Sequence, residues 1–382
     1  MRIDDNKIIY NWRELKNYKN DNEDTEDGFY HFYKDLMNFP DAWCYIVWSR
    51  RGPGKTYSAL WNQVYNEFPI IYMKRTVEDV NSICEGKNSA NVDMAPYVPI
   101  TRDKFVDIEP LKISNGLGAF YKTDVDGEKI GNAISYVMAL NKIKSVKGFE
   151  ASNCDWILLD EFIPQIGERI NHREGEQLLD LYMTVIRDRV KRGKKELKLV
   201  LFANAEEIST PITRELEIID DMALLNTSGD DNYMYLKDKR IMLHHIVNGE
   251  VPSVRMQDDS LGIYHAMKNT SWGRKTFLGE FSNNDFSNVC KMSLKNMVGF
   301  CHLKYKAHDY YIYLRNKDGM YYMTDVKIKC QYDYNLYLEN DQKRFYEELY
   351  YILRDACVGD MFKFKQYSMY DLIINYKKFF NV

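Results

Sequence analysis

Residues 49–56 read Ser-Arg-Arg-Gly-Pro-Gly-Lys-Thr, and this segment constrains the fold of the chain more than any other. It follows the apolar run WCYIVW (residues 43–48), which is typical of a strand buried on both faces, and it precedes an expected helix at residues 56–67. A glycine-rich loop between a buried strand and a helix binds phosphate through its backbone N–H groups and the helix N-terminus. The pattern GxxxxGK[S/T] is met except at its first position, which is Ser49.

The loop predicts a nucleotide site that uses ATP and Mg²⁺. Lys55 is expected to reach the β- and γ-phosphates, and Thr56 to bind the magnesium ion. The remaining loop residues are expected to surround the phosphates: Ser49, Arg50, Arg51, Gly52, Pro53 and Gly54. The alternative is a glycine turn that happens to precede a helix.

Two acids follow a second apolar strand, in the segment WILLDE (residues 156–161). Ligands of open α/β sheets bind at the carboxyl ends of the strands, so both acids are expected beside the loop. Asp160 would hold the magnesium ion, and Glu161 would act as a general base on the attacking water. The alternative is a strand that runs into a helix cap.

A third strand, in LVLFANA (residues 199–205), ends at Asn204. An asparagine here can sense the γ-phosphate and orient the water, although alone it is a common turn residue. Arg187 and Arg189 close an expected helix at residues 177–191. An arginine there can act as a finger toward a neighbouring subunit's nucleotide, or it can simply complement the helix dipole.

Three lysines occupy the loop before the acidic strand: Lys142, Lys144 and Lys147. They could contact a phosphate backbone or a neighbouring subunit, and a solvated loop explains them equally well.

Strands and helices alternate over residues 43–215, which predicts an α/β domain with a mostly parallel sheet. Residues 104–130 are expected to form a β-hairpin insertion with its turn at DVDGEK. We place the ATPase domain at residues 1–215 and an acidic connector at 216–260. An α+β domain follows at 261–382, with a hairpin turn at 317–319 and a helix around 342–357.

Composition excludes several classes of protein. Charged residues make up 28% and hydrophobic residues 45%, which fits neither a disordered nor a membrane-spanning chain. The 7 cysteines are scattered, so reduced thiols and a cytosolic location are expected rather than disulfides or zinc. Residues 261–382 hold 18 Lys and Arg against 13 Asp and Glu, a local +5 within a total of −4. This charge suits local contact with a polyanion.

With these motifs in place, the chain resembles the genome-packaging ATPases of small, protein-primed tailed phages, the phi29-like podophages. The matching segments, in order, are SRRGPGKT (49–56), LDEFI (159–163), IRDR (186–189) and FANA (202–205). The resemblance implies that the N-terminal domain is a P-loop NTPase of the ASCE type. It also implies a ring of five subunits at the procapsid portal that drives double-stranded DNA inward with ATP, in the host cytoplasm. By position, Arg187 falls at the trans-acting finger and Lys147 at a loop lysine that acts across the subunit interface.

The same resemblance implies that the C-terminal domain is an RNase H-like nuclease that has lost its activity. A nuclease of that type needs several carboxylates that converge on metal ions. Here the acids are dispersed along the sequence. Asp325 is the candidate metal ligand, and Asp309 and Asp333 could join it. A platform that binds DNA, a structural RNA or the portal is therefore expected.

Two other functions remain open from the sequence. One is a helicase or remodelling ATPase with the same P-loop site. The other is a DNA- or capsid-binding module whose nucleotide site is inactive.

Overall fold

The computed structural model describes residues 2–380 except 5, 20–26, 86–93, 146–150, 166, 169, 188, 248, 252–260, 279–280 and 282–283. The chain divides into two compact units. One comprises Met1–Leu216 with Leu224–Asn283, and the other comprises Glu217–Ala223 with Asn284–Val382. Within the described part of the chain, none of the helices combines the length and apolar character needed to cross a membrane.

The larger unit is built on a sheet that has eleven strands in the described residues. The strands from β11 to β7 run parallel, and antiparallel strands extend the sheet at both edges. The spatial order is β1 (Arg2–Asp4), β2 (Lys7–Asn11), β10 (Asp231–Leu236), β11 (Ile241–His245), β3 (Cys44–Ser49), β9 (Lys198–Asn204), β8 (Trp156–Asp160), β4 (Ile70–Lys74), β7 (Lys129–Ala139), β6 (Leu117–Thr123) and β5 (Ile108–Ser114). This confirms the predicted α/β fold with a mostly parallel sheet.

Helices pack on this sheet because the central strands are apolar throughout. Every residue of β3 is buried, and the ring of Phe32 in the first helix packs edge-on against Tyr45, Trp156 and Phe202 at 5.4–5.6 Å. The described helices of this unit are α1 (Phe32–Asn38), α2 (Lys55–Tyr65), α3 (Val77–Cys84), α4 (Val98–Lys104), α5 (Glu174–Ile186), α6 (Pro211–Glu215), α9 (Leu261–Met267) and α10 (Ser271–Gly273). Helix α7 (Ile219–Asn226) crosses the boundary between the units, because Glu217–Ala223 belongs to the smaller one. Shorter turns are η1 (Trp12–Glu14), η2 (Leu140–Ser145), η3 (Val190–Arg192) and η4 (Arg274–Leu278).

The described part of residues 216–260 is not a connector, contrary to the prediction. It supplies β10 and β11, and β11 pairs in parallel with β3, with Ile241 opposite Cys44. All five residues of β11 are buried, as expected for a strand that lies between two others, β10 and β3, inside the sheet. Of the acids that suggested a linker, Asp220 and Asp221 lie in the first turn of α7, and Asp230 and Asp231 lie at the beginning of β10.

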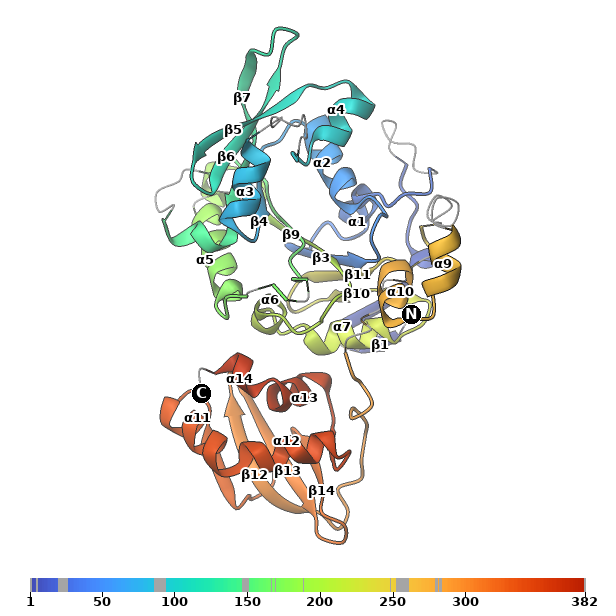
Figure 1. Cartoon of the computed structure of the whole chain (residues 1–382), viewed down its shortest axis with the longest axis vertical. Coiled ribbons are helices and arrows are strands. Elements are labelled where there is room, and N and C mark those ends of the chain that lie inside the picture. The colour runs from blue at the N-terminus through green and yellow to red at the C-terminus, as the bar shows by residue number, and fades with distance from the viewer. Residues whose placement is uncertain are drawn as a thin grey trace. The chain divides into compact units, whose positions relative to one another are not determined.

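Two other predictions need smaller corrections. The turn at DVDGEK does join β6 to β7, but the insertion has three strands, because β5 and β6 form a second hairpin. In Figure 1 the end of the β6–β7 hairpin extends away from the rest of the sheet. The helix expected at residues 177–191 ends at Ile186, and Val190–Arg192 forms the separate turn η3.

The smaller unit is an α+β fold with five strands in the order β15 (Tyr332–Asn335), β12 (Val298–Tyr305), β13 (His308–Arg315), β14 (Met320–Thr324) and β16 (Phe362–Phe364). The strands β12, β13 and β14 are antiparallel, while β15 and β16 add in parallel at opposite edges. The predicted hairpin turn is confirmed, with Gly319 at a φ of 74°. The helices are α11 (Glu339–Phe345), η5 (Tyr346–Tyr350), α12 (Tyr351–Val358), α13 (Tyr367–Ile374) and α14 (Tyr376–Phe379).

The boundary between the units differs from the expected residue 261. The main part of the smaller unit begins at Asn284, and α9 and α10 belong to the larger unit. A separate apolar core, which includes Leu303, Phe345, Leu353 and Tyr376, supports the smaller unit.

Candidate nucleotide site

The loop at residues 49–56 joins β3 to α2, as predicted. Gly52 and Gly54 have φ values of 90° and 93°, in the left-handed region that a residue with a Cβ atom rarely adopts. Gly54 is the N-cap residue of α2, and its carbonyl accepts a hydrogen bond from the Ser58 N–H at 2.9 Å. The two glycines therefore turn the chain sharply from the strand edge into the N-terminus of a helix, which is the geometry of an anion site.

Lys55 is held inside the loop by the residue that departs from the motif. The Lys55 Nζ donates to Ser49 Oγ at 2.5 Å, and the Ser49 hydroxyl donates to the Arg50 carbonyl at 2.6 Å. Glycine at position 49 could not make these bonds. Burial, reinforced by the charge of Arg50 and opposed by Asp160, lowers the pKa of Lys55 to about 8. An anion bound beside this amine would therefore favour its charged form.

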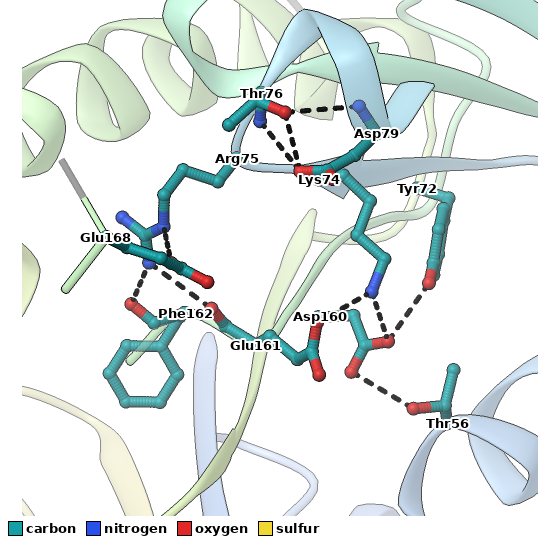
Figure 2. Close-up of polar contacts among 10 residues, drawn as sticks. All are labelled: Thr56, Tyr72, Lys74, Arg75, Thr76, Asp79, Asp160, Glu161, Phe162 and Glu168. Carbon is teal, nitrogen blue, oxygen red and sulfur yellow. Dashed lines mark hydrogen bonds and ion pairs between the residues drawn. The ribbon is translucent and has the colours of Figure 1, made fainter. Parts of the chain in front are cut away.

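The two acids lie at the carboxyl end of β8, and Asp160 is bonded on both oxygens (Figure 2). Its Oδ1 accepts from Thr56 Oγ1 at 3.0 Å. Its Oδ2 accepts from the Tyr72 hydroxyl at 3.0 Å and from Lys74 Nζ at 3.1 Å. Because Thr56 is the second residue of α2, this bond joins the phosphate loop directly to the acidic strand.

Lys74, the last residue of β4, bridges the two acids. Its Nζ also donates to Glu161 Oε2 at 3.2 Å. Burial alone would lower the pKa of Lys74, but the carboxylates of Asp160 and Glu161 outweigh that effect and raise the pKa. The ammonium group therefore neutralises part of the negative charge of the pair.

Glu161 leaves the strand in an unusual backbone conformation. Its φ is 58°, and left-handed backbone costs a residue with a side chain about 1–2 kcal/mol. Arg75 supports this turn, because its Nη2 donates to the carbonyls of Glu161 at 3.2 Å and Phe162 at 2.7 Å. The same guanidinium pairs with Glu174 and Glu168. The Glu161 side chain is 49% exposed, so solvent reaches it.

Asn204 also lies at this edge of the sheet. It ends β9, which lies between β3 and β8, and it is the register partner of Ser49. Four neighbouring strands thus bring their carboxyl ends together, and these carry Ser49, Asn204, Asp160 and Lys74.

The two arginines after α5 have different environments. Arg187 is the C-cap residue of α5 and is exposed. Arg189 is buried, and it donates to the carbonyl of Ser152 at 2.8 Å and to Asp155 Oδ1 at 2.6 Å. Arg189 is therefore a structural residue, which binds the segment that leads into β8. Because its side chain is directed to these partners, Arg187 and Arg189 do not continue α5.

The predicted loop lysines are only partly described. Lys142 and the backbone of Lys144 belong to η2, whereas the Lys144 side chain and the whole of Lys147 lie outside the described residues.

The residues present fit a magnesium–nucleotide complex. The Thr56 hydroxyl and the Asp160 carboxylate are 3.0 Å apart, and oxygen atoms of these types are the ligands that Mg²⁺ prefers. The loop amides and Lys55 would hold the phosphates, whose charge the ion would share.

Sequence reasoning missed three residues of the site: Tyr72, Lys74 and Arg75. A signal was available, because Lys74 and Arg75 directly follow the apolar segment Ile70–Met73. The rule that placed Asp160 at the carboxyl edge of the sheet applies equally to the end of this strand.

Comparisons with known proteins find a likeness in structure only. No family model matches the sequence, and no curated protein matches it either. The bacteriophage Phi-29 viral genome packaging motor assembly contains a similar chain, with a TM-score of 0.58, 16% identity, and coverage of 92% of this chain and 99% of that one. The Phi-28 gp11 DNA packaging motor is similar with a TM-score of 0.54, 16% identity, and coverage of 93% and 98%. Over nearly its whole length, this chain therefore shares the fold of the chains in these two phage packaging motors.

Proposed function

We propose that this protein is the ATP-hydrolysing motor of viral genome packaging, which moves double-stranded DNA into a procapsid. The observation that supports it best is the joining of the loop at residues 49–56 to the acidic pair through the 3.0 Å bond between Thr56 and Asp160. This site occurs in a chain whose fold matches two packaging-motor structures over more than nine tenths of its length.

Each residue of the site has a chemical task in hydrolysis. Lys55 and the loop amides bind the β- and γ-phosphates, and Thr56 and Asp160 hold Mg²⁺. Glu161 accepts a proton from the attacking water, and Asn204 orients that water. The Lys74 ammonium occupies one oxygen of Glu161 through a 3.2 Å contact, so a change in that contact would alter the rate.

The proposal includes a ring of five copies at the portal vertex, in the host cytoplasm. Arg187 is exposed beside the end of α5, as a residue that acts on a neighbour's nucleotide must be. Lys144 and Lys147 are proposed to contact a neighbouring subunit or DNA. A structural packaging RNA is a further candidate partner.

Lys55→Ala is expected to abolish ATP binding, because it removes the buried cation of the loop. Binding would be measured by isothermal titration calorimetry with ATP and Mg²⁺. Lys19→Ala, a change in the polar N-terminal region, serves as the control and should bind ATP as the wild type does. Unchanged affinity in a folded Lys55→Ala variant would contradict the site.

The smaller unit is proposed to bind rather than cut nucleic acid. Both oxygens of Asp325 accept from Lys365 Nζ, at 2.6 and 2.8 Å. Asp309 and Asp333 instead flank His302 at 2.8 and 3.0 Å. Asp325 and the Asp309–Asp333 pair therefore have different basic partners, and the described residues include no cluster suited to a metal ion.

A cationic pocket of about 340 Å³ on this unit is the proposed contact for duplex DNA. Its lining includes Arg354, Lys377 and Lys378 and has no acidic residue. The Lys377 Nζ lies over two aromatic rings, 5.1 Å from the ring centroid of Tyr346 and 5.6 Å from that of Tyr351. Positioned cations of this kind suit the phosphates of a nucleic-acid backbone.

Arg354→Gln with Lys377→Gln is expected to weaken binding of duplex DNA, measured by fluorescence anisotropy over a range of salt concentrations. Each lost phosphate contact should reduce the slope of log K against log salt by about 0.9. Lys317→Gln, in the exposed β13–β14 turn, is the matched control and should leave the slope unchanged. Wild-type affinity and slope in the double variant would exclude the pocket as a DNA contact.

Two other functions are distinguished by simple assays. A helicase or remodelling ATPase would hydrolyse ATP in response to other polymers. A binding module with an inactive site would bind DNA without hydrolysis.

A further inference from the structure

A buried ionic network lies beside the phosphate loop and takes no part in the proposed chemistry. His244, in β11, is fully buried, with Nδ1 2.9 Å from Asp35 Oδ2 and Nε2 2.9 Å from Glu250 Oε2. The Tyr233 hydroxyl lies 2.9 Å from a carboxylate oxygen of each acid, and the Tyr30 hydroxyl donates to Asp35 at 2.7 Å. Two distant parts of the chain, residues 30–35 and 233–250, therefore meet at one imidazole.

The surroundings of His244 suit its charged form. An imidazolium donates from both ring nitrogens, and here each nitrogen lies 2.9 Å from a carboxylate oxygen. Burial alone would lower the pKa of His244, but Asp35 and Glu250 outweigh it and raise the pKa to about 9. The other titratable groups around the network are Tyr30, Tyr233 and Tyr45, whose pKa values burial raises.

The network is connected to the loop on two sides. The Tyr30 N–H donates to the Pro53 carbonyl at 2.9 Å, and the Tyr30 side chain ends on Asp35. On the other side, the carbonyl of Val251 accepts from Arg50 Nη2 at 3.4 Å, and Val251 directly follows Glu250. The loop residues Arg50 and Pro53 are thus attached to neighbours of both acids.

Removal of the imidazolium would disturb both attachments together. Asp35 is 1% exposed, so its carboxylate could not be solvated in place. The Glu250 side chain is 13% exposed and also accepts from Asn232 Nδ2 at 2.7 Å. Breaking a buried ion pair by removing one partner is strongly destabilising, because it leaves an uncompensated charge. Tyr30 donates to Asp35 and Val251 follows Glu250, so a rearrangement of either acid would reach a contact with the loop.

We propose that His244 is a positioning residue, which holds Tyr30 and Val251 against the loop at residues 49–56 by pairing with Asp35 and Glu250. The loop is then formed before phosphate arrives, and ordering it adds little cost to binding. This inference rests on the proposed nucleotide site for its functional meaning. Its structural content, the order of the loop, can be measured without nucleotide.

The pairing has a defined pH dependence. The folded pKa, about 9, exceeds the ordinary value of 6.5, so the stabilisation is complete below about pH 6.5 and is lost as the pH rises through 9. Loop order is therefore expected to fall between about pH 8 and 10. Because Lys55 titrates near pH 8 in the same site, nucleotide affinity alone cannot report on His244.

His244→Gln is the first test, at pH 7.5 on the full chain. Glutamine can donate to only one of the two acids and carries no charge. Hydrogen–deuterium exchange should show loss of protection at residues 50–56, and the Kd for ATP should rise by about tenfold or more, the ratio given by 1.4 kcal/mol. His265→Gln, a change of an exposed histidine in α9, is the control and should change neither.

The second variant separates charge pairing from the shape of the ring. Adding Asp35→Asn to His244→Gln restores the net charge of the network, so loop protection and ATP affinity should recover and should no longer vary between pH 8 and 10 beyond the effect of Lys55. A purely structural role of the ring would leave the double variant as impaired as the single one.

The outcomes distinguish this inference from the proposed function. Wild-type loop protection in a folded His244→Gln variant would overturn the inference, and so would a folded double variant that does not recover. If His244→Gln does not fold, recovery of folding and loop protection in the double variant supports it. If His244→Gln loses protection at residues 50–56 but the wild type binds no ATP, the inference stands and the nucleotide site is rejected.

Discussion

Arg187→Ala is expected to lower the rate of ATP hydrolysis by about 10³–10⁵-fold while ATP affinity stays unchanged. Arg187 is exposed at the C-cap of α5, where its guanidinium can leave its own subunit. A planar, permanently charged group stabilises the charge that develops on a transferring phosphoryl group. The measurement is steady-state hydrolysis of the assembled protein, with the Kd for ATP determined separately.

Two matched variants separate this role from the helix dipole. Arg187→Lys keeps the charge at the helix end, so it should hydrolyse normally if only the dipole matters, and slowly if the guanidinium acts on a neighbour's nucleotide. Arg173→Ala removes the exposed arginine at the N-cap of the same helix and should leave the rate unchanged. Normal hydrolysis by Arg187→Ala would exclude the finger role and leave Arg187 as a residue that complements the dipole of α5.

Glu161→Gln is expected to retain ATP binding and to reduce turnover by about 10²–10⁴-fold, because the amide cannot accept the proton of the attacking water. The Glu161 side chain is half-exposed at the edge of the sheet, and Arg75 holds its backbone in the left-handed turn. Glutamine keeps the shape of the side chain and its contact with Lys74, so binding and folding should not change. Single-turnover kinetics measures the chemical step directly.

A control variant tests whether the loss of turnover is specific to Glu161 or follows from the loss of any negative charge near the site. Glu168→Gln removes another partly exposed acid near the site, one that pairs with Arg75. It should affect turnover far less than Glu161→Gln. Near wild-type hydrolysis by Glu161→Gln would remove this residue from the catalytic role.

Local patterns in the sequence predicted much of the site. Lys55 and Thr56 follow a continuous apolar strand and a glycine loop, and Asp160 and Glu161 follow another such strand. Apolar runs of this kind are buried parallel strands, whose carboxyl ends meet at one edge, so the acids could be placed beside the loop without a structure.

Pairing over long distances could not be predicted in this way. Arg75 supports the backbone of Glu161 from 86 residues away, and Asp35 reaches His244 across 209 residues. In the sequence, Arg187 and Arg189 both lie at the end of the expected helix. Long-range packing, which local patterns do not show, buries Arg189 and leaves Arg187 exposed. Strand β11 was missed because its acidic surroundings resemble a linker, although each of its residues is buried in the sheet.

The rate of ATP hydrolysis by the purified wild-type chain, measured with and without linear duplex DNA, tests the central claim most directly. The account predicts Mg²⁺-dependent hydrolysis that duplex DNA stimulates and that Lys55→Ala abolishes. Hydrolysis no faster than that of Lys55→Ala, in a folded protein that binds duplex DNA, would contradict a DNA-translocating ATPase and favour a binding module with an inactive nucleotide site.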